Sequence, residues 1–115
     1  LDSLKGKLSE NYKTDASSIS IAKKYYKIPN EEKIFGVFNY KVFGNCKEGI
    51  AVGSRGLYFR LFGKVGKVLW QELAQYKISI AAGKVILERP GGKIELFAFK
   101  QTDAENIYFI LSQMK

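Results

Sequence analysis

The sequence predicts an α+β fold in which seven antiparallel strands form a partly open barrel capped by a C-terminal helix. The chain has 115 residues, which is enough for one domain with its own core. Its middle, residues 48–78, contains three short apolar segments separated by turn residues, the pattern of an antiparallel meander. A helix signal follows the last strand-like segment, where it would cover the end of the curled sheet. One or two helices are expected before the first strand.

Residues 1–13 predict a short amphipathic helix, because apolar side chains recur there at helical spacing. These side chains are Leu1, Leu4, Leu8 and Tyr12. This stripe could dock on the rest of the domain, or belong to a longer helix, or Leu1, Leu4 and Leu8 could offer a face to a partner or to a second copy of the chain. The chain begins with leucine instead of methionine, so we also expect it to be a piece of a longer protein.

A second helix is predicted to follow, with Thr14 as its N-cap and Asp15 in its first turn. Pro29 and Asn30 would stop it. The chain therefore divides into an N-terminal helical segment, residues 1–30, and a β-rich domain, residues 31–115.

Seven segments rich in β-branched and aromatic residues predict the strands. They lie at about residues 34–40, 49–53, 57–62, 67–71, 76–81, 84–89 and 93–100. In the third strand Leu57, Phe59 and Leu61 share one face. In the fifth, Ile78 and Ile80 are expected to point inward.

The C-terminal helix has the clearest local signal. Thr102 and Glu105 have the spacing of a capping box. The apolar stripe that follows consists of Ala104, Ile107, Tyr108, Leu111 and Met114. We expect this stripe to face the core of the barrel.

Composition argues against an enzyme. The chain has no histidine and one cysteine, so acid–base catalysis and transition-metal binding lack their usual residues, and we expect no cofactor. The single cysteine, the absence of a signal-peptide pattern and the absence of a long apolar run favour a cytoplasmic location. The net charge of +8 favours anionic partners, although the basic residues are spread evenly along the chain.

The residue pattern of the predicted hairpins at residues 49–78 resembles that of bacterial PH-like domains of the pleckstrin-homology superfold, including the GRAM-like group. The matching positions are Gly49–Val52, Ser54, Gly56–Phe59, Trp70 and Tyr76–Ile78. The resemblance covers about residues 31–115 and implies a binding module without catalytic activity. Phosphoinositide-binding relatives carry a dense basic cluster between strands one and two. Here that loop has only Lys41 and Lys47, so the resemblance does not carry over a phosphoinositide site.

Basic residues around the third predicted strand form the candidate ligand surface. They are Arg55, Arg60, Lys64 and Lys67, with Tyr58 beside them. Such a rim could bind phosphate and stack a base, although a solvated outer face of a barrel strand is the favoured interpretation.

Three further residue types have simpler structural interpretations. Trp70 is expected in the core. Cys46 is expected to be buried or idle, because no base is present to activate its thiol. The pair Glu31 and Glu32 follows Pro29–Asn30 and is expected in an exposed turn.

Two classes of function remain open. The first is a non-catalytic PH-like scaffold that binds a protein or peptide, with contact to an anionic membrane surface and homo-oligomerisation as further options. The second is a small basic β-barrel that binds nucleic acid, which the charge and the surface aromatics would support.

Overall fold

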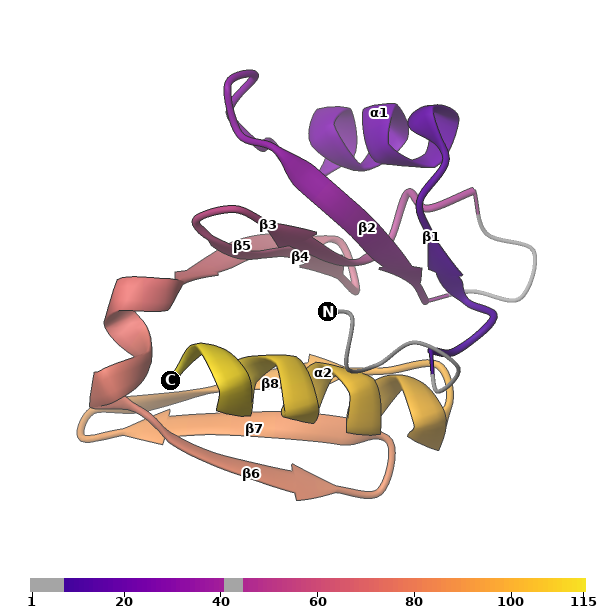
Figure 1. Ribbon diagram of the computed structural model, residues 1–115. Helices are drawn as coiled ribbons and strands as arrows, with labels where there is room; N and C mark the ends of the chain where they lie inside the picture. Colours follow the sequence, from indigo (N-terminus) through magenta and orange to yellow (C-terminus); the bar gives the residue numbers. More distant parts are fainter. Residues whose placement is uncertain (1–7, 41–44) are drawn as a thin grey trace.

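The structure is a computed structural model that describes residues 8–40 and 45–115. Figure 1 shows the arrangement of the elements. In chain order they are β1 (Tyr12–Lys13), α1 (Ala16–Tyr25), β2 (Ile34–Asn39), β3 (Gly49–Gly53), β4 (Gly56–Leu61), β5 (Lys64–Leu69), the 3₁₀ helix η2 (Trp70–Gln75), β6 (Lys77–Ala81), β7 (Lys84–Arg89), β8 (Gly92–Phe97) and α2 (Gln101–Met114).

The strands form two antiparallel sheets. The larger has the order β1-β2-β3-β4-β5, and the smaller has the order β6-β7-β8. The predicted α+β class is therefore confirmed, but the strands of the described chain do not close into a barrel. A physical reason lies in η2, which separates β5 from β6 and carries the chain from one sheet to the other (Figure 1).

The first predicted helix is wrong for residues 8–13, and Leu1 and Leu4 lie outside the described residues. Tyr12 and Lys13 instead form β1, which pairs with Phe38 and Val37 of β2. The backbone N–H of Ser9 donates to the side chain of Asn106 in α2 at 2.9 Å. A helix this short is marginal alone, so pairing with β2 and contact with α2 decide the conformation.

The second predicted helix is present as α1, with a different cap. Asp15, instead of Thr14, is the N-cap, and its carboxylate accepts the backbone N–H of Ser18 at 3.0 Å. The helix ends at Tyr25, ahead of the predicted stop, and Lys27 has a positive φ of 57°. Figure 1 shows α1 on the outer side of the larger sheet, away from α2.

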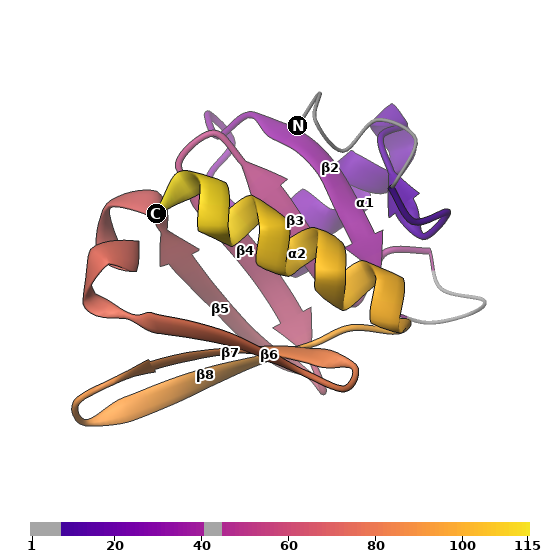
Figure 2. The ribbon, with the colours of Figure 1, turned by 60° about the horizontal axis from the view of Figure 1, so that its bottom comes forward.

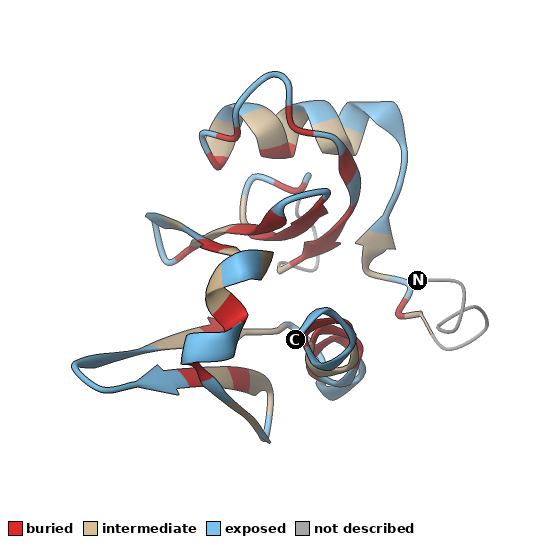
Figure 3. Cartoon of the chain, turned by 60° about the vertical axis from the view of Figure 1, so that its left-hand side comes forward, coloured by how far each residue is buried: buried red, intermediate tan, exposed pale blue. Residues whose placement is uncertain are grey.

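Two buried clusters hold these layers together. The main core lies between the two sheets and α2, and β3 and β4 supply it with Ile50, Leu57 and Leu61. The second cluster lies between α1 and the outer side of the larger sheet, where Ala22 and Tyr26 pack. Figure 3 shows the result, in which the strands between the two layers are buried.

The strand predictions largely agree with the sheets, with local corrections. The fourth strand is observed at Lys64–Leu69, so Trp70 lies in η2 instead of the strand. The fifth predicted strand is β6, in which Ile78 pairs with Leu87 and Ile80 pairs with Val85. Ile80 was expected to point inward, yet it is 37% exposed. The reason is that β6 is an edge strand, with β7 on one side only.

The C-terminal helix is present as α2, which packs against β6, β7 and η2 (Figure 2). The predicted capping box is wrong: Lys100 is the N-cap, and Asp103 accepts its backbone N–H at 3.3 Å. Ala104, Ile107 and Leu111 are buried as predicted. The stripe turns away from the core at its end, where Met114 is 45% exposed.

Candidate functional site

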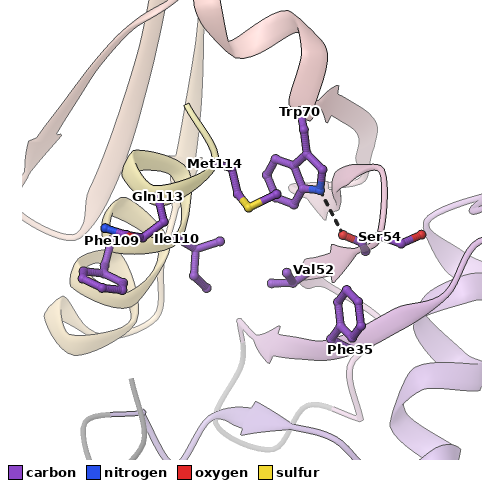
Figure 4. A pocket seen from close by; sticks show the side chains of 9 residues that line it. Phe35, Val52, Ser54, Trp70, Phe109, Ile110, Gln113 and Met114 are labelled. Atoms are coloured by element: carbon purple, nitrogen blue, oxygen red, sulfur yellow. Dashed lines mark hydrogen bonds between the residues drawn. The ribbon is translucent and has the colours of Figure 1, made fainter. Parts of the chain in front are cut away.

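An open apolar pocket of about 260 Å³ lies between the larger sheet and the C-terminal half of α2 (Figure 4). Its lining comes from β2, β3, the turn after β3, η2 and α2. The lining residues are Phe35, Val52, Gly53, Ser54, Trp70, Phe109, Ile110, Gln113 and Met114. Phe35 is 40% exposed to solvent and Met114 is 45% exposed. Large apolar side chains thus remain in contact with solvent around a concave surface.

Trp70 forms one wall of the pocket. Its indole Nε1–H donates to the carbonyl oxygen of Gly53 at 3.2 Å, and its backbone N–H donates to the carbonyl of Arg55 at 2.8 Å. The ring is half-buried and packs against the main core, so it is only partly the core residue that the sequence predicts. These two hydrogen bonds attach η2 to the turn between β3 and β4.

Glu32 holds the same turn from beneath. Its carboxylate accepts hydrogen bonds from the hydroxyl of Ser54, the backbone N–H of Arg55 at 3.0 Å and the hydroxyl of Tyr58 at 2.6 Å. It also accepts the N–H of Lys33 at 3.1 Å. Glu32 is 2% exposed, so its predicted place in an exposed turn is wrong.

The protonation of this network follows from its contacts. Burial, the largest single cause, raises the pKa of Glu32, but the four hydrogen bonds together outweigh it and leave that pKa lowered. Burial and the hydrogen bond to Glu32 raise the pKa of Tyr58 to about 12. Glu32 is therefore a structural anion with a neutral phenol beside it, an arrangement suited to positioning the turn.

The polar side chains of the pocket are few. Its polar side chains are Ser54 and Gln113, and the Ser54 hydroxyl is already engaged by Glu32. Among the described residues, no acidic or basic side chain lines it. What it offers a ligand is apolar contact area, with the Trp70 ring as its largest element.

The predicted basic residues are spread along the β4–β5 hairpin and do not all share one face of the sheet. Arg55 comes just before the first residue of β4, whereas Lys64 pairs with its last residue, Leu61, so the two lie at opposite ends of that strand. Tyr58 is buried at 4% exposure in the cluster beneath α1, so its ring is not available to stack on a base. Lys64 and Lys67 lie on β5, at the edge of the larger sheet.

Arg60 belongs to a different group, which the sequence did not indicate. Its guanidinium lies 5.6 Å from the centre of the Tyr25 ring, and the ammonium groups of Lys24 and Lys47 lie at 5.8 Å and 5.3 Å. Three cations from α1, the β2–β3 loop and β4 therefore surround one aromatic ring. No periodicity could reveal it, because its members are far apart in the chain.

The remaining predicted positions have structural roles. Leu8 is half-buried and packs against the main core, so it is not a free helix face. Cys46 is buried, as predicted, and burial raises the pKa of its thiol. Tyr26 donates its hydroxyl to the carbonyl oxygen of Cys46 at 2.8 Å, which anchors that loop beneath α1.

The described residues contain neither a metal-binding cluster nor a membrane-spanning helix. Within residues 8–40 and 45–115, no three Cys, Asp or Glu side chains lie close enough to hold a metal ion. In the same part of the chain, neither helix has the length and apolar character needed to cross a membrane. Comparison of the chain with protein-family models, with curated proteins and with solved structures finds no match.

Proposed function

We propose that the chain is a non-catalytic binding module of the PH-like kind, which recognises a protein or peptide partner through the apolar pocket. The order of the elements supports the PH-like assignment, because seven strands, β2 to β8, precede one C-terminal amphipathic helix. The motif residues Gly49–Val52 and Gly56–Phe59 lie on the paired strands β3 and β4. The two N-terminal elements, β1 and α1, are additions to that order.

The observation that carries the proposal is the pocket itself. Folded proteins normally bury large apolar side chains, and a concave group left in solvent marks a binding surface. Phe35 and Met114 stand on opposite sides of the opening, and Trp70 lies between the sheet and the helix (Figure 4). The volume and lining suit one large apolar side chain of a partner, with the rim making the surrounding contacts.

A displayed library of random peptides tests this. We expect wild-type protein to select peptides with an aromatic or large aliphatic anchor, which the variant Met114→Glu binds at least tenfold more weakly. Ser112→Glu is the matched control, because Ser112 is an exposed residue of α2 outside the pocket. Selected peptides that bind Met114→Glu as well as wild type would place the interaction elsewhere.

A second candidate is contact with an anionic membrane or nucleic acid through the cations around Tyr25. The net charge of +8 and the convergence of Lys24, Lys47 and Arg60 favour it. Vesicle sedimentation and an oligonucleotide shift at physiological salt separate the two ligands. The double variant Lys47→Ala with Arg60→Ala should weaken the interaction, whereas Lys64→Ala should leave it unchanged because Lys64 lies outside this group.

A further inference from the structure

We propose that the facing edges of β5 and β8 form a site at which an extended acidic segment of a partner adds as a β-strand. This site lies apart from the apolar pocket at α2, with which it shares no lining residue, and does not depend on the function assigned to that pocket.

Among the described strands, both are edges of their sheets. β5 is the last strand of the larger sheet and β8 is the last strand of the smaller one. The turn at Phe62–Gly63 leaves Leu61 and Lys64 as the first pair of the β4–β5 ladder. Because hydrogen-bonded and non-bonded pairs alternate from such a turn, Val65 and Lys67 direct their backbone N–H and C=O groups away from β4.

The same argument applies to β8. The turn at Pro90–Gly91 leaves Arg89 and Gly92 as the first pair, so the backbone groups of Lys93 and Glu95 point away from β7. The N–H of Ala98 donates to the carbonyl of Gly83 at 2.9 Å. This bond agrees with the alternation, in which the even-numbered residues from Gly92 on direct their backbone groups toward β7. In the described chain no hydrogen bond uses the outward N–H groups of these two edges.

A groove of about 560 Å³ separates the two edges. Phe59 of β4 and Ile94 of β8 line its inner side, where both also pack against the main core. The rings of Phe62 and Phe97 meet edge to face, with centres 5.2 Å apart, so the two sheets touch at one end of the groove. Backbone partners and an apolar floor are the two features that strand addition requires.

The charges select the occupant. Lys64, Lys67 and Lys93 line the groove and are exposed. The ion pairs of the described residues involve other lysines, and Glu95, the acid in the groove, is held by Lys84 at 2.5 Å. These three lysines, which lie outside those ion pairs, repel a second copy of the same edge and attract an acidic strand.

The faces of the strands also specify the pattern of the segment. Ile94 points to the inner face, whereas Lys67 and Lys93 belong to the outer faces of their sheets. A strand added here alternates in the same way. Its inward side chains would be apolar and its outward side chains acidic.

A capped peptide of alternating valine and glutamate, as long as β5, tests the proposal by nuclear magnetic resonance titration of the whole chain. We expect saturable binding with shifts centred on β5 and β8. A peptide of the same sequence, N-methylated at alternate residues, keeps the charge and loses the backbone donors. We expect it to bind at least tenfold more weakly.

Variants separate the edges from general charge and from the pocket. Lys67→Glu with Lys93→Glu should weaken binding at least tenfold, whereas Lys77→Glu, an exposed lysine on β6, and Met114→Glu should leave it unchanged. No binding of the unmodified peptide, equal binding of the methylated one, or equal loss with Lys77→Glu would overturn the proposal. So would a dimer of the protein alone that Val65→Lys abolishes, since the edges would then serve a second copy.

Discussion

Glu32 shows how one side chain can organise a surface that it does not itself line. Its carboxylate holds the turn containing Ser54 and Arg55, and that turn carries one wall of the apolar pocket. The bonded groups come from positions up to 26 residues away, and they bring β4 and the start of β2 together. A carboxylate without such donors would not remain ionised at 2% exposure.

The pH dependence of stability should reveal this residue. The folded-state pKa of Glu32 is lowered below the unfolded value of about 4.3, so its contribution is fully present above that value. It is lost as the pH falls through the folded pKa. We expect Glu32→Gln to reduce the free energy of unfolding at pH 7 by about 1–3 kcal/mol, with the difference from wild type shrinking below about pH 4.

Urea unfolding at a series of pH values measures the effect, with Glu31→Gln as control because Glu31 is exposed. A difference between wild type and Glu32→Gln that stays constant down to pH 2 would show that the lost contribution is packing instead of ionisation.

Among the elements, α2 contributes to both the main core and the pocket. It packs against β6, β7 and η2, and its buried face includes Ile107 and Leu111. Its other side borders the pocket, so the helix both encloses the core and supplies a candidate binding surface. This double use explains why its apolar stripe extends to Met114, which the core does not cover.

Truncation of a core residue of α2 tests this. Leu111→Ala should lower the free energy of unfolding by about 2–5 kcal/mol, because Leu111 is fully buried among residues of the main cluster. Met114→Ala should cost well under that, since Met114 is nearly half exposed. Chemical denaturation with tryptophan fluorescence reads both variants, and a loss below about 1 kcal/mol for Leu111→Ala would contradict the packing of α2.

At the scale of the whole molecule, the larger sheet is a wall shared by two cores. The main cluster lies on its inner side and the α1 cluster on its outer side. Val37 and Ala51 are therefore buried although they face away from the main core. α1 and the residues that follow it cover them, so this part of the chain belongs to the same folded body.

Removal of that segment should be costly. A chain beginning at residue 31 loses Ala22, Tyr26 and Ile28 and exposes the outer side of the sheet. At roughly 1.5–3 kcal/mol for each large apolar side chain, we expect a loss of about 3–6 kcal/mol, a large fraction of typical domain stability. Calorimetry of the full and shortened chains measures it, and equal melting temperatures would show that residues 31–115 are independent.

Features that depend on residues close together in the chain could be predicted from the sequence, whereas features that depend on contacts between distant residues could not. Alternation in β4 correctly separated Leu57 and Leu61 from Tyr58, because it depends on neighbouring residues. Glu32 was misplaced because its partners Ser54 and Tyr58 are distant in the chain and a Glu after Pro–Asn ordinarily marks an exposed turn. The pocket was missed for the same reason, since no local signal places Phe35 of β2 and Met114 of α2 around one opening.

The buried thiol of Cys46 can serve as a probe of how often the layer formed by α1 and the outer side of the larger sheet opens. It is the only cysteine in the chain, and the Tyr26 hydroxyl anchors its backbone under α1. Because the thiol is 2% exposed, an alkylating reagent reaches it when its surroundings open, so the labelling rate measures how often they open under native conditions. The rate of labelling of this thiol therefore reports how often the region around α1 opens. A lower rate in the presence of a partner would show that binding makes this opening less frequent.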